Sequence, residues 1–153
     1  MPKEKGTNIG IPIIDLKTKG FISLAYPRDL RQAVDKTVDS WKKFCALSTE
    51  IKKALPYSNT ADGVGYELKN GTGNNADRKE NFDVALVGTQ LLETYIGKIK
   101  NPIARDFVQN ATTLVGILKP IVLDFARQSE KIFDLRDFVK EVEQGEDVFF
   151  VRF

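Results

Sequence analysis

The alternation of hydrophobic and polar residues divides the chain into short apolar runs, amphipathic stretches and one segment rich in glycine and asparagine. Two apolar runs come first, at residues 11–16 and 21–26, and the turn-like residues 17–20 separate them. Both runs contain many β-branched or aromatic residues, which is typical of strands. We therefore predict two short strands, preceded by a flexible, polar N-terminus at residues 1–9.

From Arg28 the apolar residues recur at three- and four-residue steps, which is the period of an amphipathic helix. The positions that define its apolar face are Leu30, Val34, Val38, Trp41 and Cys45. Ser48 and Thr49 then offer an N-cap for a short second helix at residues 50–55, which Pro56 closes.

Residues 57–81 are the least regular part of the chain and are predicted to form a long loop. Their glycines do not make a dinucleotide-binding fingerprint, because Gly63 and Gly65 lack a third glycine at the required spacing. The segment 78–87 overlaps the end of this loop and shows partial alternation, with Phe82, Val84 and Leu86 on one side. This pattern predicts a strand or an extended segment.

The longest periodic stretch begins at Asn101 and Pro102, a favourable pair for capping and starting a helix. It predicts one long helix at about residues 102–132, which Pro120 should interrupt and kink. Its apolar stripe consists of Ile103, Phe107, Ala111, Leu114, Val115, Leu118, Val122, Phe125 and Ile132.

A last helix is expected to follow Asp134 as its cap, to carry Leu135 on its apolar face and to end at Gly145. Residues 148–153 are strongly apolar and predict a terminal strand. Such a strand needs a sheet, which this fold, a second copy of the chain or further sequence could supply. The elements together predict an α+β fold, with residues 10–153 forming a single domain.

Composition and charge exclude several classes of protein. A chain of 153 residues with 42% hydrophobic and 29% charged residues is of ordinary globular composition. No apolar run is long enough for a membrane span, the start has no secretory signal and the single Cys45 allows no internal disulfide, so we expect a cytoplasmic protein. The net charge is +2 with both signs mixed, and the basic pairs, Lys52-Lys53 among them, are expected to be solvated, which argues against nucleic-acid binding.

The chain contains no histidine, the commonest general base near neutral pH and a frequent metal ligand. Cys45 lies on an apolar helix face without a base to activate it, and Asp134 and Asp137 are interpreted as helix-start residues. We therefore assign no catalytic residue, no metal ligand and no cofactor to this chain.

The order of the motifs resembles the N-terminal region of the iron- and 2-oxoglutarate-dependent dioxygenases related to isopenicillin N synthase. The segments that carry the resemblance are IPIIDL at 11–16, GFISL at 20–24, FCAL at 44–47, STEIK at 48–52, GY at 65–66 and RKENFD at 78–83. The resemblance covers about residues 10–153. One departure is that the family's Asn-His-Gly after the second strand is Tyr26-Pro27-Arg28 here, so no substrate is inferred by analogy.

The resemblance implies a non-catalytic module that packs on a catalytic double-stranded β-helix, which the terminal strand would open. The family's His-x-Asp…His triad for Fe(II) and its arginine for 2-oxoglutarate have no counterpart in this sequence. The resemblance also implies that Tyr66, Glu67 and Phe82 face the small-molecule substrate. The other interpretation of these residues is that the two aromatic rings belong to the core and that Glu67 is exposed.

Two further hypotheses remain open at the level of sequence. The chain could be a stand-alone helical α+β protein that binds a partner through the long helix or the terminal strand, without enzymatic activity. It could also be a metal-independent enzyme that uses a tyrosine or a lysine as acid or base. On the first interpretation, the partner is the catalytic half, and the chain alone should not decarboxylate 2-oxoglutarate.

Overall fold

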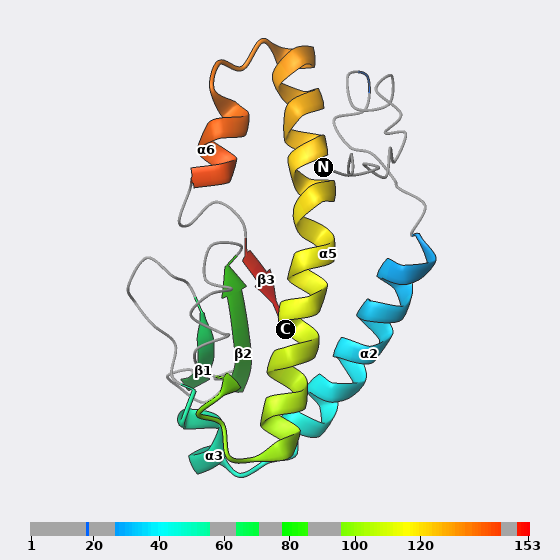
Figure 1. The fold of residues 1–153 in the computed structure, drawn as a ribbon. Coiled ribbons are helices and arrows are strands. Elements are labelled where there is room, and N and C mark those ends of the chain that lie inside the picture. The colour runs from blue at the N-terminus through cyan, green and yellow to red at the C-terminus, as the bar shows by residue number, and fades with distance from the viewer. Residues whose placement is uncertain (1–17, 19–26, 56–63, 71–77, 86–95, 145–149) are drawn as a thin grey trace.

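The computed structural model describes residue 18 and residues 27–55, 64–70, 78–85, 96–144 and 150–153. These residues form an α+β fold with four helices and a three-stranded antiparallel sheet (Figure 1). The predicted strands at 11–16 and 21–26 lie outside the described residues, as does the predicted flexible N-terminus.

Helix α2 spans Arg28–Cys45, as predicted, and packs along the first half of helix α5 (Figure 1). Its buried face differs from the predicted one, because Val38 is 40% exposed whereas Thr37 and Ser40 are buried. Both hydroxyl groups have acceptors: Thr37 donates to the carbonyl of Ala33 at 2.7 Å, and Ser40 donates to the carbonyl of Thr37 at 2.9 Å. Small side chains with satisfied hydroxyls therefore line the contact between the helices.

Two strands follow the short helix α3, Thr49–Lys53. Strand β1, Gly65–Asn70, pairs antiparallel with strand β2, Arg78–Ala85. The strand or extended segment predicted at 78–87 is a strand over residues 78–85, and residues 86–87 lie outside the described part of the chain. The predicted loop over 57–81 is wrong for residues 65–70 and 78–81, which belong to these strands. The glycine and asparagine residues of this segment suggested a loop, although apolar and polar residues alternate in β1. Tyr66 and Leu68 share one face, because side chains alternate along a strand.

Helix α5 spans Pro102–Phe133 and begins as the sequence predicts. The Oδ1 atom of Asn101 accepts hydrogen bonds from the backbone N–H groups of Ile103 and Ala104, at 3.0 and 3.1 Å. The helix runs without interruption through Pro120, contrary to expectation. Buried residues on both sides of the proline hold the helix by tertiary packing, which offsets the lost hydrogen bond.

Two positions that were expected to be inward are exposed. Ile103, in the first turn of α5, is 39% exposed, and Leu135, which was expected on the last helix but lies between α5 and α6, is 40% exposed. Asp134 caps α5 at its C-terminus in the left-handed conformation, with φ 50° and ψ 46°, so its predicted role as the cap of the next helix is wrong. Helix α6, Phe138–Gln144, receives its cap from α5: a carboxylate oxygen of Glu130 accepts from the N–H of Val139 at 2.9 Å.

Strand β3, Phe150–Arg152, pairs antiparallel with β2, so the terminal strand finds its sheet within this fold. Phe82 and Phe153 continue the ladder by exchanging backbone hydrogen bonds of 3.2 and 3.0 Å. On the opposite face of the sheet, the guanidinium of Arg152 donates to both carboxylate oxygens of Asp83, each at 2.7 Å. Asp83 is only 3% exposed, so this pair fixes β3 against β2.

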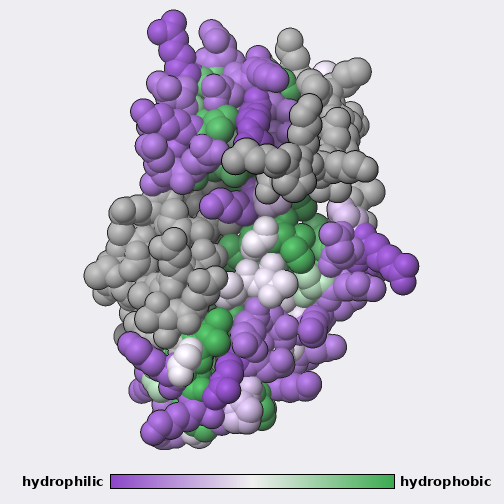
Figure 2. Space-filling view, viewed as in Figure 1, coloured by the Kyte–Doolittle hydropathy of each residue, from purple (hydrophilic) through white to green (hydrophobic). Residues whose placement is uncertain are grey.

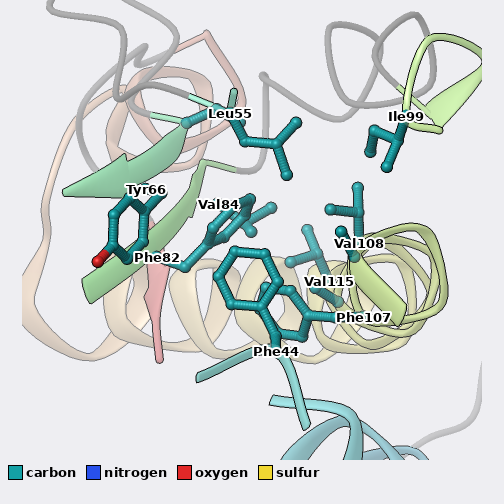
Figure 3. Packing of buried hydrophobic residues seen from close by; sticks show 12 residues of the cluster. Phe44, Leu55, Tyr66, Phe82, Val84, Ile99, Phe107, Val108 and Val115 are labelled. Carbon is teal, nitrogen blue, oxygen red and sulfur yellow. The ribbon is translucent and has the colours of Figure 1, made fainter. Parts of the chain in front are cut away.

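The core lies where α2, α5 and the inner face of the sheet meet (Figure 3). Phe107 is at its centre, and the centroid of its ring lies 4.9 to 5.5 Å from those of Trp41, Phe44, Phe82 and Phe153. Figure 2 shows hydrophilic side chains over α6 and the outer side of α2, and hydrophobic ones along the middle of α5. Among the described residues, no helix is long and apolar enough to cross a membrane.

Candidate functional site

The hairpin of β1 and β2 brings the three predicted substrate-binding residues together. Tyr66 pairs with Phe82 across the two strands, and Glu67 pairs with Asn81. Because side chains alternate along a strand, Tyr66 and Phe82 are neighbours on the inner face and Glu67 lies on the outer face. Figure 3 shows Phe82 next to Phe44 from α2, and Tyr66 at the edge of the cluster with its hydroxyl directed away from the other labelled residues.

The three residues also differ in how far they are buried. Tyr66 is 3% exposed and Phe82 is fully buried, and their ring centroids lie 6.0 and 5.8 Å from that of Phe44. Both rings therefore act as core aromatics in this structure. The side chain of Glu67 is 34% exposed, and its carboxylate lies 3.2 Å from the ammonium of Lys69. Contact between a substrate and any of the three residues stays a prediction.

A partly buried polar cluster lies beside the two rings and consists of Lys52, Glu80, the Tyr66 hydroxyl and Cys45. The side chain of Lys52 is only 4% exposed. Its Nζ atom donates to both carboxylate oxygens of Glu80, at 2.9 and 2.7 Å, and to the backbone carbonyl of Cys45, at 3.0 Å. The lysine therefore uses its three donors on three oxygens, as a buried ammonium requires.

Tyr66 contributes its ring and its hydroxyl to this cluster. The Nζ atom of Lys52 lies 5.5 Å from the ring centroid, a cation–π distance. The hydroxyl oxygen is buried without a hydrogen-bond partner among the described residues. Burial raises the pKa of Tyr66, and the negative charge of Glu80 raises it further, whereas the positive charge of Lys52 acts against them. The phenol therefore stays protonated.

The other titratable groups of the cluster also hold their protons. Burial lowers the pKa of Lys52, but the hydrogen bond from its ammonium to Glu80 and the nearby acidic groups outweigh burial, so the net pKa is raised. Burial raises the pKa of the Cys45 thiol, and Glu80 adds to this effect. A lysine that stays charged is a poor base, and a thiol that stays protonated is a poor nucleophile. The cluster is therefore suited to holding α2, α3 and the hairpin together.

The ion pair was not predicted from the sequence. The prediction that Lys52 is solvated is wrong, because Lys52 is buried and hydrogen-bonded to Glu80, 28 positions away. One signal was available: Glu80 precedes Phe82 and Val84 by two and four positions, so alternation places all three on the inner face of the sheet. An acidic side chain on a buried face requires a cationic or hydrogen-bonding partner.

Iron does not fit the residues of this chain. The sequence contains no histidine, and the described residues contain no group of three His, Cys, Asp or Glu side chains placed to hold a metal ion. The facial triad of a non-haem iron oxygenase needs two imidazoles and one carboxylate. No catalytic step through iron or 2-oxoglutarate is therefore derived for these residues.

Comparisons with protein-family models, with curated proteins and with solved structures found no match to this chain.

Proposed function

We propose that this chain acts as the non-catalytic N-terminal module of an Fe(II)- and 2-oxoglutarate-dependent oxygenase, where it packs on the catalytic β-helix and helps to shape the substrate pocket. On this proposal, the iron ligands and the oxoacid-binding arginine belong to a catalytic half outside this sequence. A cytoplasmic location is part of the proposal and agrees with Cys45 being a free cysteine.

One observation supports the proposal best. The Gly-Tyr motif at 65–66 and the charged-to-apolar motif at 78–83 are separate segments of the sequence, and they pair as neighbouring strands, with Gly65 opposite Asp83 and Tyr66 opposite Phe82. The second motif is also tied to β3, because Asp83 binds Arg152. Two of the segments that carry the resemblance, 65–66 and 78–83, are therefore neighbours in one sheet with the terminal strand.

The alternative is a stand-alone α+β protein that binds a partner without catalysis. Its support comes from α5, on which Ile103 and Phe133 are 39% and 49% exposed. The hypothesis of a metal-independent enzyme has less support, since Lys52 and Tyr66 are buried and hold their protons.

Reading the encoding DNA beyond the codon for Phe153 distinguishes the first proposal from this alternative. A continuing frame with a His-x-Asp motif, a second histidine and an arginine supports the oxygenase module. A stop codon at that point would overturn it in favour of the partner-binding protein.

The expressed chain offers a biochemical test of the same proposal. We expect no succinate to form when the chain is supplied with Fe(II), ascorbate, oxygen and 2-oxoglutarate. Turnover by this polypeptide alone would refute the assignment of all metal ligands to another part of the enzyme.

Glu67 tests the substrate contact in a longer protein that carries the catalytic half. Glu67→Gln should raise KM for the primary substrate and leave KM for 2-oxoglutarate unchanged. Lys69→Gln is the matched control, because it breaks the same ion pair but keeps the carboxylate. Equal effects of the two variants would show that only the ion pair matters.

A further inference from the structure

A pocket beside α3 is lined by none of the residues of the polar cluster. It has a volume of about 400 Å³ and lies between α3, the segment at residues 98–101 and the first turn of α5. Its walls are apolar and come from Ile51, Leu55, Ile99 and Ala104. Small-molecule sites occupy roughly 300–1,000 Å³ and have mostly apolar walls, so this pocket is of suitable size and character.

The walls are held in place by hydrogen bonds that do not involve a ligand. The guanidinium of Arg105 donates from Nε and Nη2 to the carbonyl of Ile99, at 3.1 and 2.8 Å. The carbonyl of Leu55 accepts from the N–H of Tyr66 at 2.7 Å. Leu55 and Ile99 also belong to the hydrophobic core, at one end of the cluster in Figure 3. The pocket is therefore preformed, which lowers the entropic cost of binding.

The rim of the pocket favours an anion. Lys98 and Lys100 are exposed and line the pocket, and the N-terminus of α5 adds a partial positive charge close by. Glu50 is the one acidic side chain among the lining residues. Its pKa is lowered because the carboxylate accepts hydrogen bonds from its own backbone N–H and from the hydroxyl of Ser48. The hydrogen-bond partners of the Glu50 carboxylate are thus its sequence neighbours, and among the described residues no acidic side chain pairs with Lys98 or Lys100.

The end of α5 cannot hold the anion by itself. The Oδ1 atom of Asn101 already accepts from the N–H groups of Ile103 and Ala104, and Pro102 has no N–H to offer. The charged end of a ligand must therefore lie at the lysine rim, while its apolar part occupies the space between the walls.

We propose that this pocket binds a medium-chain aliphatic carboxylate. The aliphatic chain packs between Leu55, Ile99 and Ala104, where it is removed from water, and the carboxylate pairs with Lys98 and Lys100. A nucleotide or another polyanion fits less well, because the lining offers apolar walls and only two cations.

Octanoate and octanol are suitable probes because they differ only in the head group. Each is titrated into the full chain labelled with ¹⁵N, and the amide signals of Ile99 and Ala104 are followed by NMR. We expect saturable binding of octanoate at these amides, with octanol binding several-fold more weakly, and octanoate binding that weakens as salt is added.

Two variants with matched controls test the parts of the site. Lys98→Gln combined with Lys100→Gln should weaken octanoate about tenfold, the sum of two exposed ion pairs, and leave octanol unchanged. The control combines Lys42→Gln with Lys43→Gln, which removes the same charge from exposed positions on α2.

Ala54 lines the pocket and is exposed, so Ala54→Phe should fill the space without disturbing the core and abolish binding of both probes. Ala46→Phe is its control, an exposed alanine at the C-cap of α2.

The proposal is overturned if octanol binds as tightly as octanoate, if the lysine variant behaves like its control, or if Ala54→Phe still binds either probe. It is also overturned if neither probe saturates the amides. Concentration-dependent shifts of the same signals without any probe would identify a second copy of the chain as the occupant instead.

Discussion

The buried ion pair between Lys52 and Glu80 allows a quantitative prediction. The lysine side chain is 4% exposed, whereas the glutamate side chain is 33% exposed. Breaking a buried ion pair by removing one partner costs about 3–5 kcal/mol, because the other charge stays buried without compensation. The cost should therefore depend on which partner is removed.

Glu80→Gln leaves the ammonium of Lys52 buried, with the Cys45 carbonyl and one amide oxygen as acceptors. We expect a loss of about 3 kcal/mol in the free energy of unfolding, the low end of the range because the amide still accepts a hydrogen bond. For a chain of this size, this loss corresponds to a fall of about 6–12 °C in Tm. Lys52→Met leaves a carboxylate that water can reach, so about 1 kcal/mol should be lost.

The double variant, with Lys52→Met and Glu80→Gln together, contains no buried charge. It should lose about 1–2 kcal/mol, which is less than the sum of the single losses and gives a coupling energy of about 2–3 kcal/mol. Glu67→Gln is the control, because it breaks an exposed pair and should change stability by less than about 0.5 kcal/mol.

Urea denaturation followed by the fluorescence of Trp41 measures these differences. Trp41 is the single tryptophan, and its ring stacks on Phe44, with centroids 5.5 Å apart, so its emission reports on the core. The reasoning is refuted if Glu80→Gln costs no more than Glu67→Gln, if Lys52→Met is the more damaging change, or if the two losses add.

Three further predictions concern other parts of the fold. Asp83→Asn weakens the bidentate pair with Arg152, so stability should fall by about 2–3 kcal/mol and hydrogen exchange of the Phe153 amide should speed up; unchanged exchange would contradict the role of this pair. Asn101→Ala removes the cap of α5 and should cost about 1 kcal/mol by thermal denaturation, whereas Asn101→Ser should restore most of it. The groups of the polar cluster with raised pKa bind protons more tightly in the folded state, so the stability they contribute is complete at neutral pH. It should fall as pH rises above about 9.0, the ordinary pKa of the Cys45 thiol, and a stability profile that stays level up to pH 11 would argue against the cluster.

The helices were predictable because their signals are local. The period of residues 28–45 and the Asn101-Pro102 start depend on side chains within a few positions of each other. The buried face of α2 was less predictable, since Thr37 and Ser40 are buried only because α5 packs on that side. Their hydroxyls donate to carbonyls of α2 itself, and Thr37 also donates to the carbonyl of Asn110 on α5 at 3.2 Å, so polarity did not prevent burial.

The candidate site was predictable only in part. The motifs left open whether Tyr66 and Phe82 face a substrate or belong to the core, and alternation along β2 was a signal for the inward face of Glu80. That Tyr66 and Phe82 pack against Phe44, far away in sequence, could not be read from the motifs. Whether a side chain is buried depends on the residues that pack over it, and the residue that packs on these two rings, Phe44, belongs to another element, α2.

The sequence alone determined the α+β class, the start and length of the long helix and the lack of imidazole ligands for iron. Only the tertiary structure decided that β3 joins this sheet and that Lys52 is buried against Glu80. The physical reason is that helical period and capping follow from bonds and contacts within a few residues. Lys52 and Glu80 are 28 positions apart, and β3 is about 70 positions from the part of β2 that it joins. Such pairings depend on which surfaces the folded chain brings together.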